Sequence, residues 1–484
     1  MEDRKKFWVY GLSAAFILLN SFFIMKEMFW FMLLPVILLV AIIFLFSLDR
    51  LLLLIAFLTP LAINIKDLNL GFSVSLPTEP LLLAILILFV LRQFLQSGFD
   101  KKVLYHPITL AIFFLLLWMF ITTLTSALPV VSIKYLLSRL WFVIPMFLLG
   151  TQLFRKLENI PVFIWLYVVA MTGIVFFTII KHASFGFNED IGHWVMRPFY
   201  NDHTAYGAML ALFIPALTGF ALFSENSRTT RLVSFIFLGI FFVALILSFS
   251  RAAWISVAFS FGVFILFLLR IRFRWVSLGT LTLAFLFFSF QNQILERLEK
   301  NKQDSSTDLV EHIRSISNIS SDASNLERIN RWQSALRMFH ERPVLGWGPG
   351  TYQFLYAPYQ YSREKTIIST NAGDMGNAHS EYIGPLAESG IVGTLTVILL
   401  MIIVLYSGLR LARHGSTPRV RMYSLVITLG LITYYTHGLL NNFLDTDKAA
   451  VPFWAFLGML VAMEVYHNTS NAETEDLPSE VNAG

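Results

Sequence analysis

The stretch IVGTLTVILLMIIVLYSGLRL, residues 391–411, holds 21 residues and a single charged side chain, Arg410. A helix of about 20 apolar residues is long enough to cross the hydrocarbon core of a bilayer, so this stretch predicts a transmembrane helix. Similar apolar runs recur along the chain and predict about 12–14 transmembrane helices. The predicted spans lie near 7–24, 28–48, 51–63, 79–95, 108–127, 135–154, 161–181, 203–223, 232–249, 252–270, 275–290, 391–411, 421–441 and 450–466.

The composition of the whole chain indicates the same class of protein. Of its 484 residues, 56% are hydrophobic and only 14% are charged, and the mean hydropathy is +0.66. Soluble proteins carry about 25% charged residues, so we expect an all-α, polytopic integral membrane protein. The chain has no cysteine, which excludes disulfides and cysteine nucleophiles. The first ten residues, MEDRKKFWVY, lead into an apolar run without a small-residue cleavage site, which favours a first spanning helix over a cleaved signal.

Lys and Arg residues gather in alternate short loops between the predicted spans. Because such loops stay in the cytoplasm, we expect both termini there and residues 291–390 outside it. The clusters are Arg4–Lys6, Lys101–Lys102, Arg155–Lys156, Arg228 with Arg231, Arg270–Arg274, and Arg410–Arg421. The predicted organisation is N-terminal transmembrane helices (1–200), transmembrane core helices (201–290), one long extracytoplasmic loop (291–390), C-terminal transmembrane helices (391–466) and a polar cytoplasmic tail (467–484).

The long loop is expected to contain one amphipathic helix. The motif SNLE at 324–327 is typical of a capping box, with Ser324 at the N-cap and Glu327 three residues on. Apolar residues then recur at helical spacing, and Pro343 is expected to end the helix before the turn GWGPG. The apolar positions are Leu326, Ile329, Trp332, Leu336 and Phe339. Within 377–390, NAHSEYIGPLAESG, we expect Pro385 and Gly390 to break the chain before the next span, and Glu388 to cap or orient that turn.

Polar side chains near the predicted outer face are the candidate functional residues, because charges at membrane depth are costly unless paired or bound to a ligand. Each also has a structural interpretation: an interfacial charge at a helix end, a solvated helix face, an ordinary loop residue or a structural histidine. The candidates are Arg197 and Asn201 in MRPFYNDH, Arg251 in SFSRAAW, Arg328 and Arg331 in LERINRW, and His379 in NAHSEY.

These residue types favour a particular chemistry. Arginine offers bidentate hydrogen bonds to phosphate oxygens and keeps its charge, which suits a pyrophosphate. A histidine suits removal of a proton from a hydroxyl. No metal is expected, since the histidines show no HExxH or other ligand spacing. GWGPG lacks the Lys-Ser/Thr of a phosphate loop and is expected to be a turn. Together the candidates fit transfer from a lipid-pyrophosphate donor to a hydroxyl.

Three motifs in this order resemble the O-antigen ligase family, which includes the Wzy-type O-antigen polymerases. They are SFSRAAW, LERINRWQSALRMFHERPVLGWGPGTYQF and NAHSEYIGPLAESGIVG, and the resemblance covers roughly residues 195–410. It implies a GT-C-type membrane glycosyltransferase in the inner membrane, with its active site facing the periplasm. It also implies a glycan donor on undecaprenyl pyrophosphate and no cofactor.

The resemblance assigns roles to the candidates. Arg251 and Arg328 match the arginines that contact the donor pyrophosphate, and Arg331 is a less certain substitute. His379 matches the histidine that activates the acceptor hydroxyl, while Asn201 and Arg197 fall in the donor-side loop. We expect an O-antigen ligase, whose acceptor is the lipid A-core. A Wzy-type polymerase acting on a lipid-linked repeat, or a lipid-linked oligosaccharide transporter, are the alternatives. The roles of Glu388 and Arg139 stay open.

Overall fold

A computed structural model describes residues 2–26, 47–65, 74–95, 99–271, 323–366, 369 and 376–468. It divides into two compact units, Met1–Ile55 and Ala56–Gly484. The predictions for 28–48 and 275–290, for the first part of the long loop and for most of the C-terminal tail fall outside the described residues. The first unit contains α1 (Glu2–Met25), as the apolar run after MEDRKK predicts.

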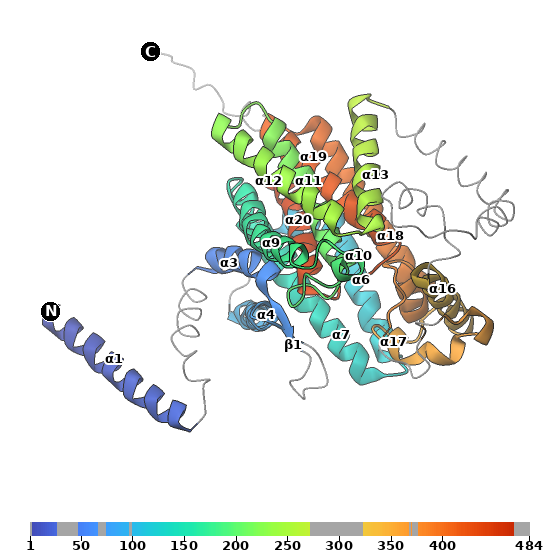
Figure 1. The fold of residues 1–484 in the computed structure, drawn as a ribbon, viewed down its shortest axis with the longest axis horizontal. Coiled ribbons are helices and arrows are strands. Elements are labelled where there is room, and N and C mark those ends of the chain that lie inside the picture. The colour runs from blue at the N-terminus through green and yellow to red at the C-terminus, as the bar shows by residue number, and fades with distance from the viewer. Residues whose placement is uncertain are drawn as a thin grey trace, which may run out of the picture. The chain divides into compact units, whose positions relative to one another are not determined.

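The prediction of an all-α membrane protein is confirmed. The spans predicted within the described residues are helical over most of their length, although 51–63 runs into β1 and 421–441 runs past the end of α19. Eight helices in the described residues are long and apolar enough to cross a membrane. The long helices after α1 are α3 (Leu48–Leu61), α4 (Thr78–Leu95), α6 (Pro107–Leu124), α7 (Pro129–Phe142), α9 (Asn159–Ala183), α11 (His203–Leu222), α12 (Arg228–Leu247), α13 (Arg251–Leu268), α16 (Ala323–Glu341), α18 (Ile383–His414), α19 (Pro418–His437) and α20 (Asp447–Tyr466). Figure 1 shows them as a helical bundle.

Shorter elements connect the long helices. A π-helix, Val143–Leu149, and α8 (Gly150–Leu153) extend α7 toward α9. The sequence did not predict the antiparallel pair β1 (Ile63–Ile65) and β2 (Val74–Leu76), in which Asn64 faces Ser75. The remaining short helices are α5 (Lys101–Leu104), α10 (Glu189–Gly192), α17 (Tyr352–Leu355) and the 3-10 turns Ala357–Tyr359 and Ser362–Glu364.

Helix starts follow the local sequence. The Asp202 side chain accepts hydrogen bonds from the backbone N–H groups of Thr204 and Ala205 and caps α11. Ser227 and Thr417 cap α12 and α19 in the same way. Such caps satisfy N–H groups that have no partner within the helix. Helices α6, α7 and α19 begin with proline, which needs no such partner.

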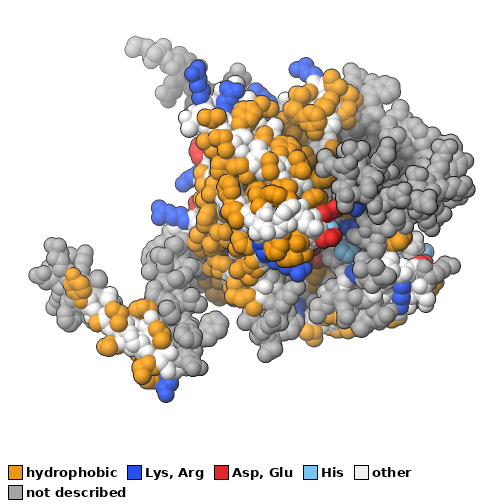
Figure 2. Space-filling model, viewed as in Figure 1, with side chains coloured by type: hydrophobic (Ala, Val, Ile, Leu, Met, Phe, Trp, Pro, Cys, Tyr) orange, Lys and Arg blue, Asp and Glu red, His pale blue; other side chains and the backbone are white. Residues whose placement is uncertain are grey.

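The core of the second unit lies around α11, α19 and α20. Nearly every residue of α20 from Asp447 to Met463 is buried, and α11 packs against α12, α13 and α19 (Figure 1). By contrast, few residues of α12 and α13 are buried. Hydrophobic side chains cover much of the visible surface of these helices in Figure 2. An apolar outer surface is what contact with lipid requires, because lipid tails are as apolar as a protein core.

Helix α18 contains the break that the sequence predicts at Gly390. This residue has φ 67° and ψ −168°, far from helical values, so α18 consists of two helical segments. A glycine tolerates this backbone because it has no Cβ. A side chain would also collide with the Val344 carbonyl group, whose oxygen lies 2.1 Å from the position of a Cβ. Pro385 lies in the first turn of α18, where proline is tolerated, and does not break the helix.

The loop helix forms, but the predicted capping box does not. Helix α16 begins at Ala323, so Ser324 lies inside it rather than at the N-cap. Three of its five apolar positions, Leu326, Ile329 and Leu336, are each 37% exposed. The buried residues are polar or small, together with one methionine: Glu327, Asn330, Arg331, Ser334, Ala335 and Met338. Tertiary hydrogen bonds to this polar side decide the orientation, which hydrophobic periodicity does not encode.

Candidate active site

His379 lies in a loop, residues 376–382, that is held on both sides. Before it, the Asn377 carbonyl accepts a hydrogen bond from Arg331 Nη1 at 3.0 Å. After it, the Glu381 N–H donates to the Gly438 carbonyl at 2.8 Å, which ties the loop to the end of α19. The preceding residue, Ala378, is 3% exposed. These contacts fix the backbone that carries the imidazole.

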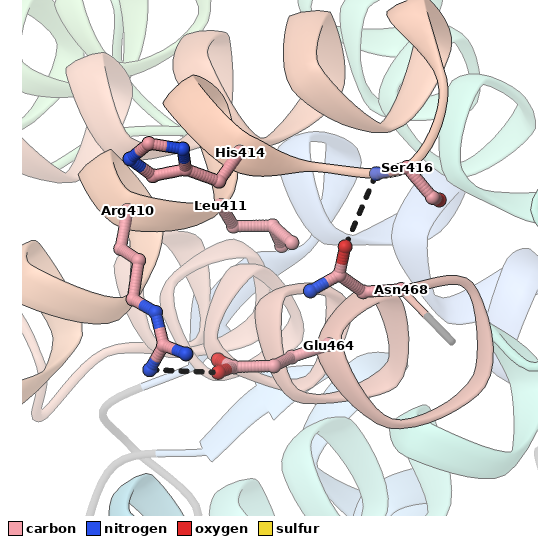
Figure 3. A pocket seen from close by; sticks show the side chains of 6 residues that line it. All are labelled: Arg410, Leu411, His414, Ser416, Glu464 and Asn468. Atoms are coloured by element: carbon pink, nitrogen blue, oxygen red, sulfur yellow. Dashed lines mark hydrogen bonds and ion pairs between the residues drawn. The ribbon is translucent and has the colours of Figure 1, made fainter. Parts of the chain in front are cut away.

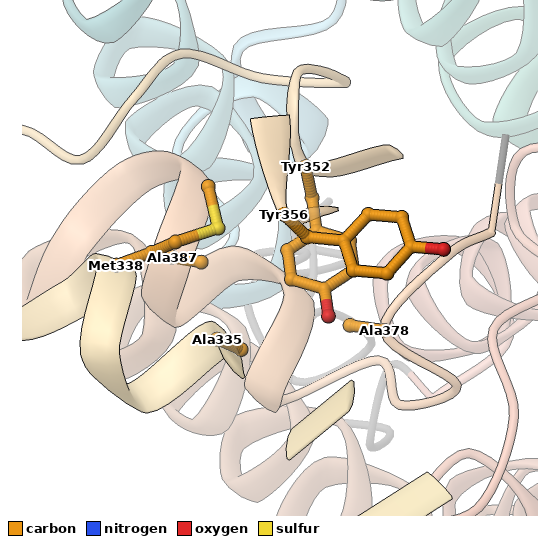
Figure 4. Close-up of a cluster of buried hydrophobic side chains, with 6 residues drawn as sticks. All are labelled: Ala335, Met338, Tyr352, Tyr356, Ala378 and Ala387. Carbon is orange, nitrogen blue, oxygen red and sulfur yellow. The ribbon is translucent and has the colours of Figure 1, made fainter. Parts of the chain in front are cut away.

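Ala378 belongs to a small hydrophobic core under the loop. It lies with Ala335 and Met338 of α16, Tyr352 and Tyr356 after the glycine-rich turn, and Ala387 of α18 (Figure 4). The two tyrosine rings stack with centroids 5.2 Å apart. The loop is therefore anchored by packing as well as by hydrogen bonds.

The backbone of His379 has a left-handed conformation, with φ 48°. Such a φ is uncommon for a non-glycine residue and clusters at functional sites, where the surroundings hold it in place. The Asn377 side chain supports this turn by accepting the His379 N–H at 3.1 Å. Among the residues that the structure describes, neither ring nitrogen of His379 has a hydrogen-bond partner. The ring is therefore available to a substrate.

The charges around His379 keep its ring neutral. Burial, together with the nearby charges of Arg331 and Arg328, lowers the pKa of His379 to about 3. A neutral imidazole has a lone pair that can accept a proton, as a general base requires. An anion bound between these arginines would offset their charge and raise the pKa again. The site thus couples the basicity of His379 to the charge of a bound ligand.

The guanidinium group of Arg331 makes hydrogen bonds to other groups of the protein. It is 7% exposed, its Nε donates to Glu327 Oε1 at 2.8 Å, and its Nη1 donates to the Asn377 carbonyl. Burial alone would raise the pKa of Glu327, but hydrogen bonds from Ser369, Arg331 and Thr366 lower it. The ion pair is therefore formed at neutral pH. This geometry makes Arg331 a brace for the His379 loop.

Arg328 is on the same helix but is only half buried. Its Nε donates to the Leu440 carbonyl at 3.2 Å, in the connection between α19 and α20. Its charge acts on His379 and also on His203 and His437. Arg328 therefore combines partial exposure with an electrostatic effect on His379, and its contact with substrate stays a prediction.

Arg251 begins α13 at the same end of the bundle. A Cβ at Gly207 of α11 would lie 2.9 Å from Ser250 Cβ, and Gly207 is one turn after His203. The Ser250 hydroxyl is buried and has no hydrogen-bond partner among the described residues, and it does not cap the helix. Exposed N–H groups at a helix start attract anions. Arg251, the helix start and the Ser250 hydroxyl together suit a phosphate oxygen.

Arg197 and Asn201 lie in the connection before α11. Arg197 Nε donates to the Asn201 carbonyl at 2.9 Å, and both side chains are exposed. Their exposure leaves both available to a ligand at this end of the bundle. Only Asn201 also faces the large cavity described next.

A cavity of about 1190 Å³ adjoins the His379 loop. One wall is apolar and comes from α4, α6 and α7, with residues such as Leu83, Leu115 and Val131. The lining also includes the polar residues Asn377, Ser380 and Glu381 and the apolar Ala378, which lie on either side of His379 in sequence. Its volume is that of a ligand site rather than a packing defect.

Sequence reasoning left the role of Arg139 in the wall of this cavity open and missed its partners Tyr135 and Asp445. Arg139 Nη2 donates to Tyr135 Oη at 2.7 Å and to Asp445 Oδ1 at 3.0 Å, and its Nη1 donates to the Leu444 carbonyl at 3.0 Å. This network accounts for the charge within α7. The sequence offered one signal for this network, namely a Tyr and an Arg four residues apart in an apolar span. Their partner Asp445 is distant in sequence, so the sequence did not reveal it.

Glu381 was also missed, although it lies two residues after His379. Its Oε1 accepts hydrogen bonds from Tyr434 Oη at 2.6 Å and from the N–H groups of Phe443 and Leu444. Burial and the neighbouring charge of Asp445 raise the pKa of Glu381. Its carboxyl group joins the His379 loop to the connection between α19 and α20.

Glu388 holds the glycine-rich turn GWGPG, rather than the turn before residues 391–411 that the sequence predicted. Its Oε1 accepts the Tyr352 N–H at 3.0 Å, and its carbonyl accepts the Gly348 N–H at 2.8 Å. Gly346, Gly348 and Gly350 all have positive φ, so GWGPG is a turn that packs against α18. The turn thereby connects the end of α16 to the helix that follows His379.

A second, smaller cavity of about 360 Å³ lies at the other end of α18 (Figure 3). Arg410 and Glu464 form its ion pair at 4.0 Å, and Asn468 Oδ1 accepts the Ser416 N–H at 3.1 Å. Arg410 is about 40 Å along the helix from Ile383 at 1.5 Å per residue. None of the candidate residues lines this cavity. In the described part of the chain, no group of three His, Asp or Glu side chains is placed to hold a metal ion.

The fold and the site define a multi-pass membrane protein with a substrate-sized cavity beside a histidine and several arginines. Residues 236–398, about a third of the chain, match the family model described as O-antigen ligase. This segment of the chain is similar to the O-antigen ligase family. The segment contains Arg251, Arg328, Arg331 and His379, whereas Arg197 and Asn201 precede it. Comparison with curated proteins gives no match.

The matched segment supports an enzyme of the membrane glycosyltransferase class to which O-antigen ligases and polymerases belong. Such an enzyme uses a lipid-linked glycan as donor and a glycan as acceptor. The apolar helices agree, because a lipid-linked substrate must be reached from the bilayer.

Proposed function

We propose that the protein transfers a glycan from undecaprenyl pyrophosphate to a hydroxyl of the lipid A-core, as an O-antigen ligase of the inner membrane. His379 is the general base in this proposal, and the active site of the protein faces the periplasm. The observation that supports this proposal is a His379 imidazole that has no hydrogen-bond partner among the described residues and feels the charge of Arg328. A base in the electrostatic field of a cation suits a reaction in which a hydroxyl loses a proton while an anion leaves.

The reaction follows from these groups. The acceptor oxygen attacks the anomeric carbon of the donor sugar while its proton passes to a nitrogen of His379. The bond between the anomeric carbon and the pyrophosphate oxygen breaks, and that oxygen keeps the electron pair. Arg251 and Arg328 stabilise the resulting negative charge by hydrogen bonds. His379 then releases its proton to solvent.

The remaining candidates have supporting roles in this proposal. Arg331 positions the His379 loop through the Asn377 carbonyl, since its guanidinium is already bound within the protein. Asn201 and Arg197 contact the donor glycan near the start of α11. Their exposed position in the connection before this helix supports the assignment.

The test is transfer by the purified protein in vesicles. A glycan on undecaprenyl pyrophosphate is supplied with either lipid A-core or a second lipid-linked repeat. A ligase forms glycosylated lipid A-core. A polymerase forms longer lipid-linked chains, and that product would replace the proposed acceptor. Movement of intact donor across the vesicle membrane without any product would instead indicate a transporter and contradict the proposal.

A further inference from the structure

The carboxyl group of Glu381 is fixed through one of its two oxygens. Oε1 accepts hydrogen bonds from Tyr434 Oη at 2.6 Å, from the Phe443 N–H at 2.8 Å and from the Leu444 N–H at 3.1 Å. A carboxylate has about four acceptor sites on its two oxygens, so three donors use all that Oε1 provides. The orientation of the carboxyl group is therefore set by α19 and by the connection between α19 and α20.

The second oxygen of this carboxyl group, Oε2, is open to a ligand. Among the described residues, no group donates a hydrogen bond to it, and it is not one of the polar atoms that are both sealed from solvent and without a partner. Oε2 therefore keeps solvent-accessible surface. Glu381 also lines the cavity of about 1190 Å³, so Oε2 is the atom through which its carboxyl group can contact a ligand there.

The charges around Glu381 determine which kind of ligand fits. Arg139, a cation in the cavity wall, is already paired with Asp445 at 3.0 Å. Burial and the charge of Asp445 raise the pKa of Glu381, so further negative charge beside it is unfavourable. A phosphate would add such charge, whereas a hydroxyl is neutral and donates a hydrogen bond. Because a carboxyl oxygen keeps acceptor capacity in either protonation state, a hydroxyl is the fitting partner for Oε2.

Glu381 belongs to the same anchored loop as the candidate base. Its N–H donates to the Gly438 carbonyl at 2.8 Å, so its backbone and its side chain are both held by the chain around the end of α19. Two residues span at most about 7 Å between Cα atoms, which limits the separation of the His379 and Glu381 backbones. A hydroxyl bound at Oε2 is therefore held by the loop that also carries the His379 imidazole.

We propose that Glu381 Oε2 accepts a hydrogen bond from a hydroxyl group of a glycan substrate, and that this contact contributes to the choice of glycan. The inference rests on the proposed function, in which two glycans reach the site and Glu381 has no role in recognising either. Donor and acceptor both carry hydroxyl groups, so the experiment determines to which of them this hydroxyl belongs. Glu381 is then a substrate-binding residue, and His379 remains the base.

Glu381→Gln tests the contact with little change in shape. The amide oxygen can replace Oε1 and accept the same three hydrogen bonds, whereas the amide nitrogen replaces Oε2 and has no acceptor capacity. We expect the KM for one glycan to rise about tenfold, the KM for the other to stay within twofold, and the melting temperature to stay close to wild type. A higher KM for donor assigns the hydroxyl to the donor glycan, and a higher KM for acceptor assigns it to the acceptor.

Two further variants separate this contact from a disturbance of the loop. Glu341→Gln makes the same change in an exposed carboxyl group of α16 that accepts the Tyr359 hydroxyl at 2.7 Å, and both KM values should stay within twofold. Tyr434→Phe removes one donor to Oε1 but leaves Oε2 in place, so either KM should rise less than threefold. The inference is overturned if Glu381→Gln leaves both KM values unchanged or raises both alike, or if Tyr434→Phe raises the same KM as much.

Binding measurements separate this inference from the proposed function. Deacylated lipid A-core oligosaccharide and the glycan on undecaprenyl pyrophosphate are titrated separately into the full-length protein in detergent, and tryptophan fluorescence is recorded. We expect saturable binding of both, with the affinity for one of them about tenfold weaker in Glu381→Gln. That result without glycan transfer by the wild type would refute the ligase function but support the contact. Glycan transfer with equal affinities of the wild type and Glu381→Gln for both glycans would refute the contact alone.

Discussion

Arg331 of α16 donates a hydrogen bond to the Asn377 carbonyl at 3.0 Å, two residues before His379. The same guanidinium is paired with Glu327 at 2.8 Å on the previous turn of the helix. One buried side chain therefore links the loop helix to the backbone of the candidate base. The cost of burying this cation is offset by its two partners.

Glu327→Ala is expected to destabilise the protein by about 3–5 kcal/mol, because it leaves Arg331 as a buried charge without its carboxylate. The measurement is thermal unfolding of the purified protein in detergent. Glu341→Ala, at the exposed end of the same helix, is the control and should change stability far less. Equal effects of the two variants would show that the Glu327–Arg331 pair does not brace the fold.

His379→Ala is expected to abolish glycan transfer while donor binding and the melting temperature stay close to wild type. The reason is that its ring nitrogens bind no described protein group, so their removal breaks no internal hydrogen bond. The assay is product formation in vesicles, with His340→Ala as a control on an exposed histidine of α16. Wild-type turnover by His379→Ala would remove the general-base assignment.

The depressed pKa of His379 predicts a dependence of stability on pH. Its pKa falls from 6.5 to about 3 on folding, so between these values the unfolded chain binds more protons. Stability is therefore expected to decline as pH falls from about 6.5 toward 3. His379→Gln removes this contribution, so its melting temperature should fall less than that of the wild type between about pH 7 and pH 5. If the melting temperatures of both proteins fell by the same amount between about pH 7 and pH 5, this would contradict the lowered pKa of His379.

Arg251→Ala and Arg328→Ala are each expected to weaken the use of donor by about 1.5–3 kcal/mol, the range for a hydrogen bond to a charged group. This corresponds to roughly 10- to 150-fold in kcat/KM for donor. Arg251→Lys should recover only part of the loss, because an ammonium cannot form two parallel bonds to phosphate. Arg342→Ala, exposed directly after the end of α16, serves as the control. Full activity of Arg251→Lys would exclude a bidentate contact.

Gly348→Ala is expected to destabilise the turn that packs on α18. Its φ is 110°, and a Cβ would lie 2.1 Å from Ser126 Oγ, so both the backbone and the neighbours oppose a side chain. Gly173→Ala on the exposed side of α9 meets nothing within 4 Å and should be neutral or stabilising by about 0.5–1 kcal/mol. Melting temperatures of the two variants decide this, and a Gly348→Ala variant as stable as Gly173→Ala would contradict the argument.

Much of the fold could be predicted from the chain because membrane helices are encoded locally. A run such as 391–411 must satisfy its backbone hydrogen bonds internally in lipid, so its length and composition determine its structure. The orientation of α16 could not be found in this way. Its polar residues Glu327 and Arg331 are buried because their partners, Ser369 and Asn377, return from distant sequence.

The candidate site could likewise be predicted only in part from the sequence. His379 and the arginines stood out because charges are rare in so apolar a chain, and a family resemblance gave them roles. Asp445 and Glu381 did not, because their part in the site depends on contacts between α7, the His379 loop and the connection after α19. The buried side-chain atoms near the cavity that make no hydrogen bond to the described residues, such as Trp141 Nε1 and Tyr435 Oη, depend on tertiary packing alone.

In the proposed mechanism, the break at Gly390 places the reaction at the headgroup layer of the bilayer. Residues 391–414, the 24 that follow it in α18, extend about 36 Å at 1.5 Å per residue, which is enough to cross the hydrocarbon core. The turns of α18 before Gly390, and the loop that carries His379, then lie in the headgroup layer. Both substrates then arrive by lateral diffusion within a thin sheet of lipid. Turnover should accordingly follow the mole fraction of donor in the membrane rather than its concentration in the bulk suspension, and dilution with inert phospholipid should slow the enzyme at constant total donor.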